Sequence, residues 1–263
     1  MAGQVLRSQS GGILTLTLDN PESRNALTLD MSGQLCAMLR EAAADTSVRA
    51  VVLTGSGGAF CAGGDVKAMA AGRDAGLTLD QRAERLRERA ESSRLLHEMG
   101  KPSIAVIPGA AAGAGLALAL ACDIRLASSD AKFTTAFAKV GLAGDFGVSW
   151  FLTRMLGVAR ARELLMLAPV LSAEQALALG LVTRVFPAAD FARAAATMVE
   201  ELAAGPTVAY SHIKQNINAA ADGALAPSLD IEALRQARCM MTEDHAAATK
   251  AFANREKPVF SGR

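Results

Sequence analysis

Two runs of small residues carry the chemistry that can be read from this chain. They are residues 59–67 (AFCAGGDVK) and 108–116 (PGAAAGAGL). Each follows an apolar, strand-like segment, 50–53 in the first case and 104–107 in the second. Small side chains let a ligand approach the backbone closely, so one N–H from each loop could bind a single oxygen atom. We therefore expect an oxyanion hole of main-chain donors. For either run alone, a tight strand-to-helix turn with small residues for packing is the alternative.

Length and composition indicate one large domain, or one domain with an extension. The 263 residues are 51% hydrophobic and 20% charged, which suits a buried core and argues against disorder. The formal net charge of +1 excludes a broad basic field, so we expect no nucleic-acid partner. No apolar run suits a membrane span and no secretory signal is evident, so we expect no membrane partner and a cytoplasmic location. The cysteines lack C-x-x-C spacing, which indicates neither a zinc site nor a disulfide framework.

Hydrophobic periodicity predicts strands and helices in alternation. Leu14, Leu16 and Leu18 share one face of a half-buried strand, and Thr28 suits the N-cap of the helix that follows. Two strands and one helix recur through the first two-thirds, which predicts an α/β spiral of repeated units. The expected strands are 13–18, 49–54, 103–107, 123–127, 132–135 and 181–185. The expected later helices are 78–99, 113–121, 148–156, 159–168, 172–180, 188–204, 206–222 and 228–254.

Two of these predicted helices have distinctive surfaces. Segment 78–99 is dense in Arg and Glu, which is typical of a solvated helix face. The tail after about residue 200 has an apolar face that we expect to pack on the core or on a neighbouring subunit. That face holds Ile213, Ile217, Ile231, Leu234 and Met241.

Five phrases in order along the chain resemble the crotonase superfamily, the enoyl-CoA hydratase/isomerase family. They are 18–27 (LDNPESRNAL), 60–65 (FCAGGD), 111–115 with 122–124, 172–174 with 180–182, and 252–260 with 262–263. The resemblance implies a crotonase (ClpP-like) spiral of ββα units with an acyl-CoA site in residues 1–200. It also implies a C-terminal helical trimerisation region in 201–263, hence a homotrimer or a dimer of trimers. No metal, nicotinamide or flavin is implied, because coenzyme A belongs to the substrate.

The resemblance also implies roles for individual residues. The N–H groups of Gly64 and Ala114 would form the oxyanion hole, hold the thioester carbonyl and stabilise an enolate. Lys257 could meet the phosphates of coenzyme A, or be no more than a solvated lysine. The path of coenzyme A would be lined by Ala62, Gly63, Asp65 and Val66 and flanked by Arg24 and Ala26.

The sequence departs from the family's hydratases at the site. A hydratase of this family uses two glutamates, and Ala117 and Phe137 stand at those positions. Neither side chain can hold or deprotonate a water molecule. We therefore expect ordinary hydration by that route to be absent.

A different acid, Asp145, lies in the glycine-flanked loop 141–147 (GLAGDFG). The preceding phrase 136–142 resembles members similar to phenylacetyl-CoA ring-epoxide isomerase, in which a lone carboxylate near this position does the chemistry. One carboxylate suffices to remove a proton from one carbon and return it to another. Apolar neighbours, namely Phe137, Phe146 and Trp150, would raise its pKa. The alternative is that Asp145 only caps the helix beginning near Gly147.

The prediction is an acyl-CoA isomerase that shifts a double bond through a dienolate, with Asp145 as the acid and base. Met69, Phe137, Leu142 and Trp150 would shape the acyl pocket, although core packing accounts for Met69, Leu142 and Trp150 equally well. Three alternatives stay open: a hydratase in which Asp145 alone positions water, carbon–carbon bond chemistry of the dihydroxynaphthoyl-CoA synthase type, and a catalytically silent acyl-CoA binder.

Overall fold

A six-stranded sheet is the base of the molecule. The computed structural model describes residues 3–72 and 75–263. The strand order is β1-β2-β3-β4-β6-β9; β1 and β2 pair antiparallel and the other neighbours pair parallel. These strands are β1 (Gln4–Ser10), β2 (Ile13–Asp19), β3 (Ala50–Gly55), β4 (Ser103–Ile107), β6 (Ile124–Ser128) and β9 (Arg184–Phe186). A smaller sheet joins β5 (Ala111–Ala112), β7 (Lys132–Thr134) and β8 (Leu171–Ser172).

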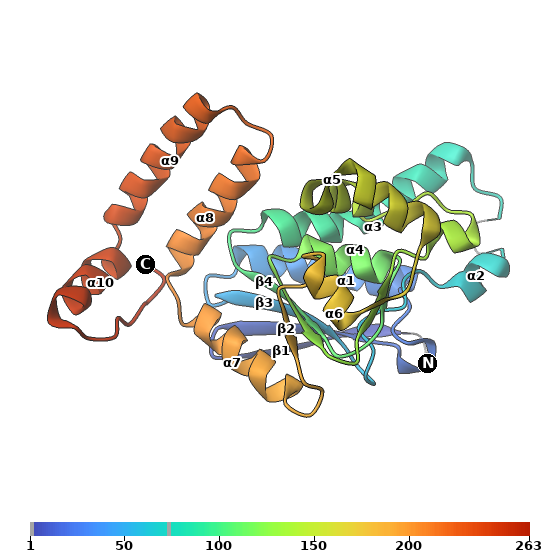
Figure 1. The fold of residues 1–263 in the computed structure, drawn as a ribbon, viewed down its shortest axis with the longest axis horizontal. Helices are drawn as coiled ribbons and strands as arrows, with labels where there is room; N and C mark the ends of the chain where they lie inside the picture. The colour runs from blue at the N-terminus through green and yellow to red at the C-terminus, as the bar shows by residue number, and fades with distance from the viewer. Residues whose placement is uncertain (1–2, 73–74) are drawn as a thin grey trace.

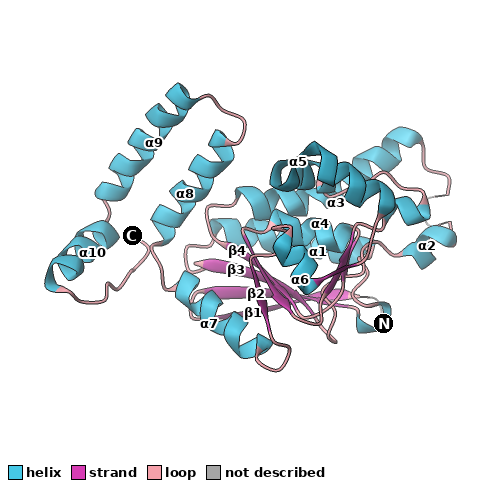
Figure 2. Ribbon diagram, viewed as in Figure 1, coloured by secondary structure: helices cyan, strands magenta, loops and turns pink. Residues whose placement is uncertain are grey.

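Helices cover both faces of the larger sheet (Figures 1 and 2). The helices are α1 (Leu29–Ala44), α2 (Val66–Ala70), α3 (Leu79–Glu98), α4 (Ala114–Ala121), α5 (Val148–Leu167), α6 (Ala173–Ala178), α7 (Phe191–Ala203), α8 (Thr207–Ala220), α9 (Leu225–Met240) and α10 (Glu243–Asn254). The group α1, α3, α4 and α5 packs on one face, and α7 packs alone on the other (Figure 1). Among the described residues no helix is long and apolar enough to cross a bilayer.

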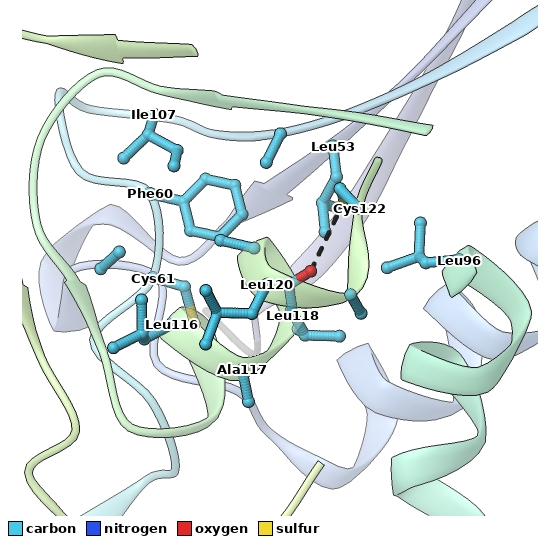
Figure 3. Packing of buried hydrophobic residues seen from close by; sticks show 14 of the residues in the cluster. Leu53, Phe60, Cys61, Leu96, Ile107, Leu116, Ala117, Leu118, Leu120 and Cys122 are labelled. Atoms are coloured by element: carbon cyan, nitrogen blue, oxygen red, sulfur yellow. Dashed lines mark hydrogen bonds between the residues drawn. The ribbon is translucent and has the colours of Figure 1, made fainter. Parts of the chain in front are cut away.

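The local signals in the sequence explain the core elements. Leu14, Leu16 and Leu18 are fully buried on one face of β2, as their alternation predicts. The hydroxyl of Thr28 accepts a hydrogen bond from Met31 N at 3.1 Å and caps α1. Every residue of α4 is buried, because this short helix runs through the main hydrophobic cluster beside Phe60 (Figure 3). Packing in the core therefore fixes the position of the N-terminus of α4.

The structure corrects two of the predicted elements and adds a strand that was not predicted. The predicted helix 228–254 is two helices, because Thr242 accepts a hydrogen bond from His245 N at 3.1 Å and starts α10 as a new N-cap. The last predicted strand, 181–185, lies at Arg184–Phe186. Strand β1 escaped prediction because Val5 is its one buried residue, so no alternation marks it. The break predicted between 156 and 159 is confirmed: Gly157 has a φ of 75° and kinks α5.

The C-terminal helices α8, α9 and α10 form an arm that extends away from the sheet (Figure 1). All five residues of the predicted apolar face are exposed, and Met241 is 88% exposed. In this single chain, therefore, that face does not pack on the core. The division into residues 1–200 and 201–263 stays a prediction.

A buried ion pair holds the base of this arm to the core. Lys214 of α8 donates to the Asp123 carboxylate at 2.8 Å and to the carbonyl of Leu96 at 2.7 Å. The Lys214 side chain is only 8% exposed and that of Asp123 is 28% exposed. Asp123 also accepts hydrogen bonds from the backbone N–H and the hydroxyl of Ser103. Asp123 therefore organises the junction between β4, β6 and α8.

Replacing Lys214 with Met is expected to lower the free energy of unfolding by about 2 kcal/mol. The change leaves a largely buried carboxylate without its counter-ion, and partial exposure of Asp123 keeps the loss below that of a fully enclosed pair. Denaturant unfolding followed by circular dichroism measures it, with exposed Lys250→Met as the matched control. The double variant K214M/D123N should recover part of the loss. Equal stabilities of the wild type and K214M would contradict this account of the anchor.

Candidate active site

The two small-residue loops lie against each other. The N–H groups of Phe60 and Cys61 both donate to the Ala110 carbonyl at 3.0 Å. In return, Ala112 N–H donates to the Cys61 carbonyl at 2.9 Å. These hydrogen bonds cross between segments some 50 residues apart in sequence. The pairing of the two loops that the sequence predicts is therefore present.

Glycine is required where the loops approach most closely. A Cβ at Gly115 would lie 2.3 Å from the Cys61 carbonyl oxygen, closer than any packing allows. Gly63 has a φ of +98°, and a Cβ there would lie 2.9 Å from the Ala112 carbonyl oxygen. The small residues thus serve packing, as the alternative interpretation holds. They also bring the backbone of residues 63–64 beside the N-terminus of α4.

The two predicted donors, Gly64 and Ala114, occupy suitable positions in these loops. Ala114 is the first residue of α4, where N–H groups have no partner within the helix and the helix dipole favours negative charge. Leu27 N–H donates to the Gly63 carbonyl at 2.7 Å, which fixes the peptide unit that carries Gly64 N–H. Among the described residues neither Gly64 N–H nor Ala114 N–H donates a backbone hydrogen bond. Their role as oxyanion donors stays a prediction.

The segment between β2 and α1 supports the first loop from the side. Ala62 N–H donates to the carbonyl of Arg24, whose backbone is left-handed with a φ of 50°, at 2.9 Å. The next residue, Asn25, is fully buried, and its amide donates to the carbonyls of Ser56 and Ala59. Arg24 and buried Ala26 thus lie beside the first loop, and their place along the path of coenzyme A stays a prediction. Sequence reasoning gave Asn25 no role, although its place in phrase 18–27 was a signal.

The remaining residues of the predicted path lie at the start of α2. The carboxylate of Asp65 accepts a hydrogen bond from Ala68 N at 3.0 Å and caps this helix. Val66 is 52% exposed, and Gly64 touches Met69: a Cβ at Gly64 would lie 2.7 Å from the Met69 terminal carbon. The loop therefore continues directly into the wall of a cavity.

That cavity has a volume of about 620 Å³ and brings together four predicted residues, Met69, Phe137, Leu142 and Asp145. It borders both small-residue loops, because Met69 touches Gly64 and a Cβ at Gly113 would lie 3.9 Å from the Phe137 ring. Phe137 comes from a short 3₁₀ helix, Phe137–Val140, and Asp145 from the loop before α5. The structure thus places a carboxylate in the same cavity that meets the paired loops.

The Asp145 side chain does not cap the helix that follows it. Its Oδ1 is buried and has no hydrogen-bond partner among the described residues. Burial raises the pKa of the carboxyl above its ordinary value, and the positive charge of Arg89 offsets part of that rise. Helix α5 begins at Val148 with Gly147 as its cap residue, and Val148 N–H bonds the backbone carbonyl of Asp145. The side-chain capping interpretation is therefore wrong.

Trp150 does not belong to this cavity, so its prediction as an acyl-pocket residue is corrected. It lies one turn into α5 and lines a separate cavity of about 460 Å³ together with His97 and Phe151. Its ring centroid is 5.0 Å from that of His97, and the Arg154 guanidinium lies 3.9 Å from its ring. The positive φ of Phe146 and Gly147 reverses the chain between Asp145 and α5, which separates two side chains that are close in sequence.

Lys257 also lies apart from the site within one chain. The segment after α10 folds back on the arm: Ser261 N–H donates to the Asp244 carboxylate at 2.6 Å, and Arg49 donates to the Phe260 carbonyl at 3.0 Å. The arm and α2 are at opposite ends of the molecule (Figure 1). Exposed Lys257 could therefore meet coenzyme A only at the site of another copy.

The two positions that carry glutamates in hydratases hold no polar group here. Ala117 is fully buried in the hydrophobic cluster of α4 (Figure 3), and Phe137 is 6% exposed at the cavity wall. Asp145 is thus the one carboxylate among the described residues that line this cavity.

Sequence reasoning missed the cationic wall of the cavity. Helix α3 contributes Arg82, Arg85, Leu86 and Arg89 to the lining. Arg89 is only 7% exposed, and its guanidinium lies 5.7 Å from the centre of the Phe146 ring. Helix α3 is therefore solvated on part of its surface, as predicted, while another part of it lines the cavity. The signal was available, because spacings of three and four residues place these arginines on one face.

Replacing Asp145 with Asn is expected to stabilise the folded protein at neutral pH by about 1 kcal/mol. A raised pKa means that folding favours the protonated acid, so the ionised carboxylate costs stability. That cost is absent below the ordinary pKa of 3.8 and complete above the raised pKa, so the advantage of the variant should grow with pH. Unfolding free energies measured from about pH 4 to pH 8 test this. A D145N advantage that shrinks as pH rises would contradict the assigned burial.

Comparisons with known proteins agree with this geometry. The Enoyl-CoA hydratase/isomerase family model matches residues 8–263. The chain is 37% identical over 255 residues to a probable enoyl-CoA hydratase of Rhodobacter capsulatus, covering 97% of this chain and 96% of that one. It is 36% identical over 264 residues to the 1,2-epoxyphenylacetyl-CoA isomerase of Escherichia coli, covering 98% of each. The crystal structure of an enoyl-CoA hydratase from Polaromonas sp. JS666 superposes with a TM-score of 0.92 at 36% identity, covering 98% of this chain and all of that one.

The fold and these comparisons together define the class of this protein. The chain belongs to the enoyl-CoA hydratase/isomerase family. The resemblance drawn from five sequence phrases and the expected crotonase fold are therefore confirmed.

Proposed function

We propose that this protein is an acyl-CoA isomerase that moves a double bond in the acyl group, with Asp145 as its acid and base. The observation that carries the proposal is a carboxylate whose Oδ1 is buried and has no hydrogen-bond partner among the described residues, in a cavity whose wall lies against the two small-residue loops. The similarity to the 1,2-epoxyphenylacetyl-CoA isomerase of Escherichia coli supports the isomerase choice. The similarity to enoyl-CoA hydratases is equally close in identity, so the choice depends on the site.

The proposed reaction begins with a 3-enoyl thioester whose carbonyl oxygen accepts hydrogen bonds from Gly64 N–H and Ala114 N–H. The Asp145 carboxylate removes a proton from the carbon next to the carbonyl, and the bonding electrons move into a dienolate. The two donors stabilise the negative charge that develops on the oxygen. Asp145 then returns the proton to the terminal carbon of the dienolate. Atoms and electrons balance within the substrate, so the reaction needs no redox cofactor and no metal.

Hydration is the alternative function, and the cavity favours isomerisation over it. Adding water requires one group to deprotonate the water and a source of a proton for the neighbouring carbon. With Ala117 and Phe137 at the glutamate positions, Asp145 would have to do both alone. An allylic shift requires Asp145 only to remove one proton from the substrate and to return one to it.

Incubating the protein with a 3-enoyl-CoA and a 2-enoyl-CoA in ¹⁸O-labelled water separates these functions. We expect the two enoyl isomers to interconvert with no gain of labelled oxygen in the mass spectrum. A hydroxyacyl product carrying the label would establish the hydratase instead. Binding of both thioesters without any conversion would establish a silent acyl-CoA binder.

We also propose that the protein assembles as a homotrimer or a dimer of trimers through its arm. The apolar residues that α8–α10 leave exposed, including Leu225 at 76% and Phe252 at 87%, suit burial against another copy. Such an assembly could bring Lys257 of one copy to the coenzyme A bound by another. A monomer in sedimentation equilibrium would refute this part of the proposal.

A further inference from the structure

The cavity that holds Asp145 has an excess of positive charge, and a plain hydrocarbon chain has no group that could interact with it. Among the described residues that line it, three carry positive charge and one carries negative charge. The positive groups are Arg82, Arg85 and Arg89, all from α3. The chain as a whole has a net charge of +1, so this concentration is local.

The three arginines form a row along one face of α3. Because they are spaced three and four residues apart, their side chains are neighbours along one face of the helix. Exposure falls along the row: Arg82 is exposed, Arg85 is half-buried and Arg89 is buried. The row therefore leads from the surface toward Arg89, the residue whose charge acts on Asp145.

The neighbouring charges of α3 do not share this face. Arg87 pairs with Glu91 at 2.9 Å on the exposed side of the helix and does not line the cavity. Arg82, Arg85 and Arg89 have further interactions within the protein, so the inference rests on their convergence on one wall and not on a lack of partners. Guanidinium groups arranged in this way bind carboxylates through paired, charge-assisted hydrogen bonds.

We propose that the acyl group of the substrate ends in a carboxylate, so that the substrate is the mono-thioester of a dicarboxylic acid. This inference rests on the proposed function, because Asp145 marks where the reacting carbons lie. The rise of an α-helix puts Arg85 about 6 Å and Arg82 about 10 Å along α3 from Arg89. A short dicarboxylic chain spans that separation. Arg85 then selects the substrate by pairing with its terminal carboxylate.

The phosphates of coenzyme A are the other anions that these arginines could meet. The residues expected along the path of coenzyme A, namely Ala62, Gly63, Asp65 and Val66, do not line this cavity. Asp145, Phe137 and Leu142, which face the acyl group in the proposed function, do line it. The position of the row thus favours the acyl carboxylate as its ligand.

Titration calorimetry with saturated thioesters tests the proposal without turnover. The probes are glutaryl-CoA, adipoyl-CoA and suberoyl-CoA, each compared with its own monomethyl ester, which has nearly the same length but no terminal charge. We expect the wild type to bind at least one free acid about tenfold more tightly than its ester. In Arg85→Met that preference should fall to about twofold or less, while Arg87→Met keeps the wild-type preference. Circular dichroism establishes that both variants are folded.

Two results would overturn the proposal. In one, the wild type binds every acid and its ester equally. In the other, Arg85→Met weakens acids, esters and free coenzyme A by the same factor, which assigns the row to the phosphates. A retained carboxylate preference with no reaction of unsaturated thioesters would refute the proposed function alone, so the two failures are distinguishable.

Discussion

Replacing Asp145 with Asn is expected to lower kcat for the double-bond shift by about 10³-fold while leaving the Kd for acyl-CoA unchanged. The amide has almost the same shape as the carboxyl but can neither accept nor return a proton at the reacting carbons. No other residue can take over this role, because Asp145 is the one carboxylate among the described residues that line the cavity. Steady-state kinetics with a 3-enoyl-CoA and calorimetric binding of a saturated acyl-CoA measure the two quantities.

Two further variants control this result. Asp145→Glu keeps an acid on a longer side chain and should retain part of the activity. Asp190→Asn changes an exposed carboxylate that pairs with Arg193 at 2.8 Å, and it should behave as the wild type. If D145N keeps more than about a tenth of the wild-type kcat, the assignment of Asp145 as acid and base is wrong, because loss of such a group costs at least about 10²-fold.

Replacing Ala114 with Pro is expected to reduce kcat by about 10²- to 10³-fold, because it deletes one of the two oxyanion donors. Proline has no N–H, and the first position of a helix is where it is best tolerated. Ala114 occupies that position in α4 and has no intrahelical hydrogen bond to lose. Because Ala114 is buried, the thermal midpoint of the variant should be measured alongside kcat.

Ala114→Gly is the matched control for the missing donor. It removes a methyl group but keeps the N–H, so kcat should stay within a few-fold of the wild type. Similar losses in the glycine and proline variants would mean that packing around the Ala114 side chain matters and the N–H does not. A folded proline variant with full activity would exclude Ala114 from the oxyanion hole.

Local sequence signals predicted the parts of the fold whose cause is local. Leu14, Leu16 and Leu18 alternate because β2 has a buried face, and Thr28 caps α1 through its own hydroxyl. The two small-residue runs were also readable, because only residues without large side chains permit backbone contacts such as that between Gly115 and Cys61. Of the cavity residues, Phe137, Leu142 and Asp145 belong to the stretch that resembles the isomerases of the family, whereas Met69 lies in none of the family phrases.

The parts that escaped prediction depend on how distant segments meet. Trp150 is five residues from Asp145, yet the left-handed backbone at Phe146 and Gly147 directs it to another cavity. Arg89 lies in a segment whose composition indicates a solvated helix. Its burial arises because α3 packs against α1, where Arg89 Nε donates to the Ser32 hydroxyl at 3.4 Å, and beside the ring of Phe146. The spacing of the arginines places them on one face of α3, but the segments that this face meets are distant in sequence.

Hydrogen exchange at the acyl carbons tests the central claim most directly. The wild type and D145N are incubated with a 3-enoyl-CoA in deuterated water, and the acyl groups are analysed by mass spectrometry. The account predicts that the wild type incorporates deuterium at the two carbons that exchange a proton with Asp145, and that D145N incorporates almost none. Undiminished exchange in D145N, with the thioester bound normally, would contradict the account.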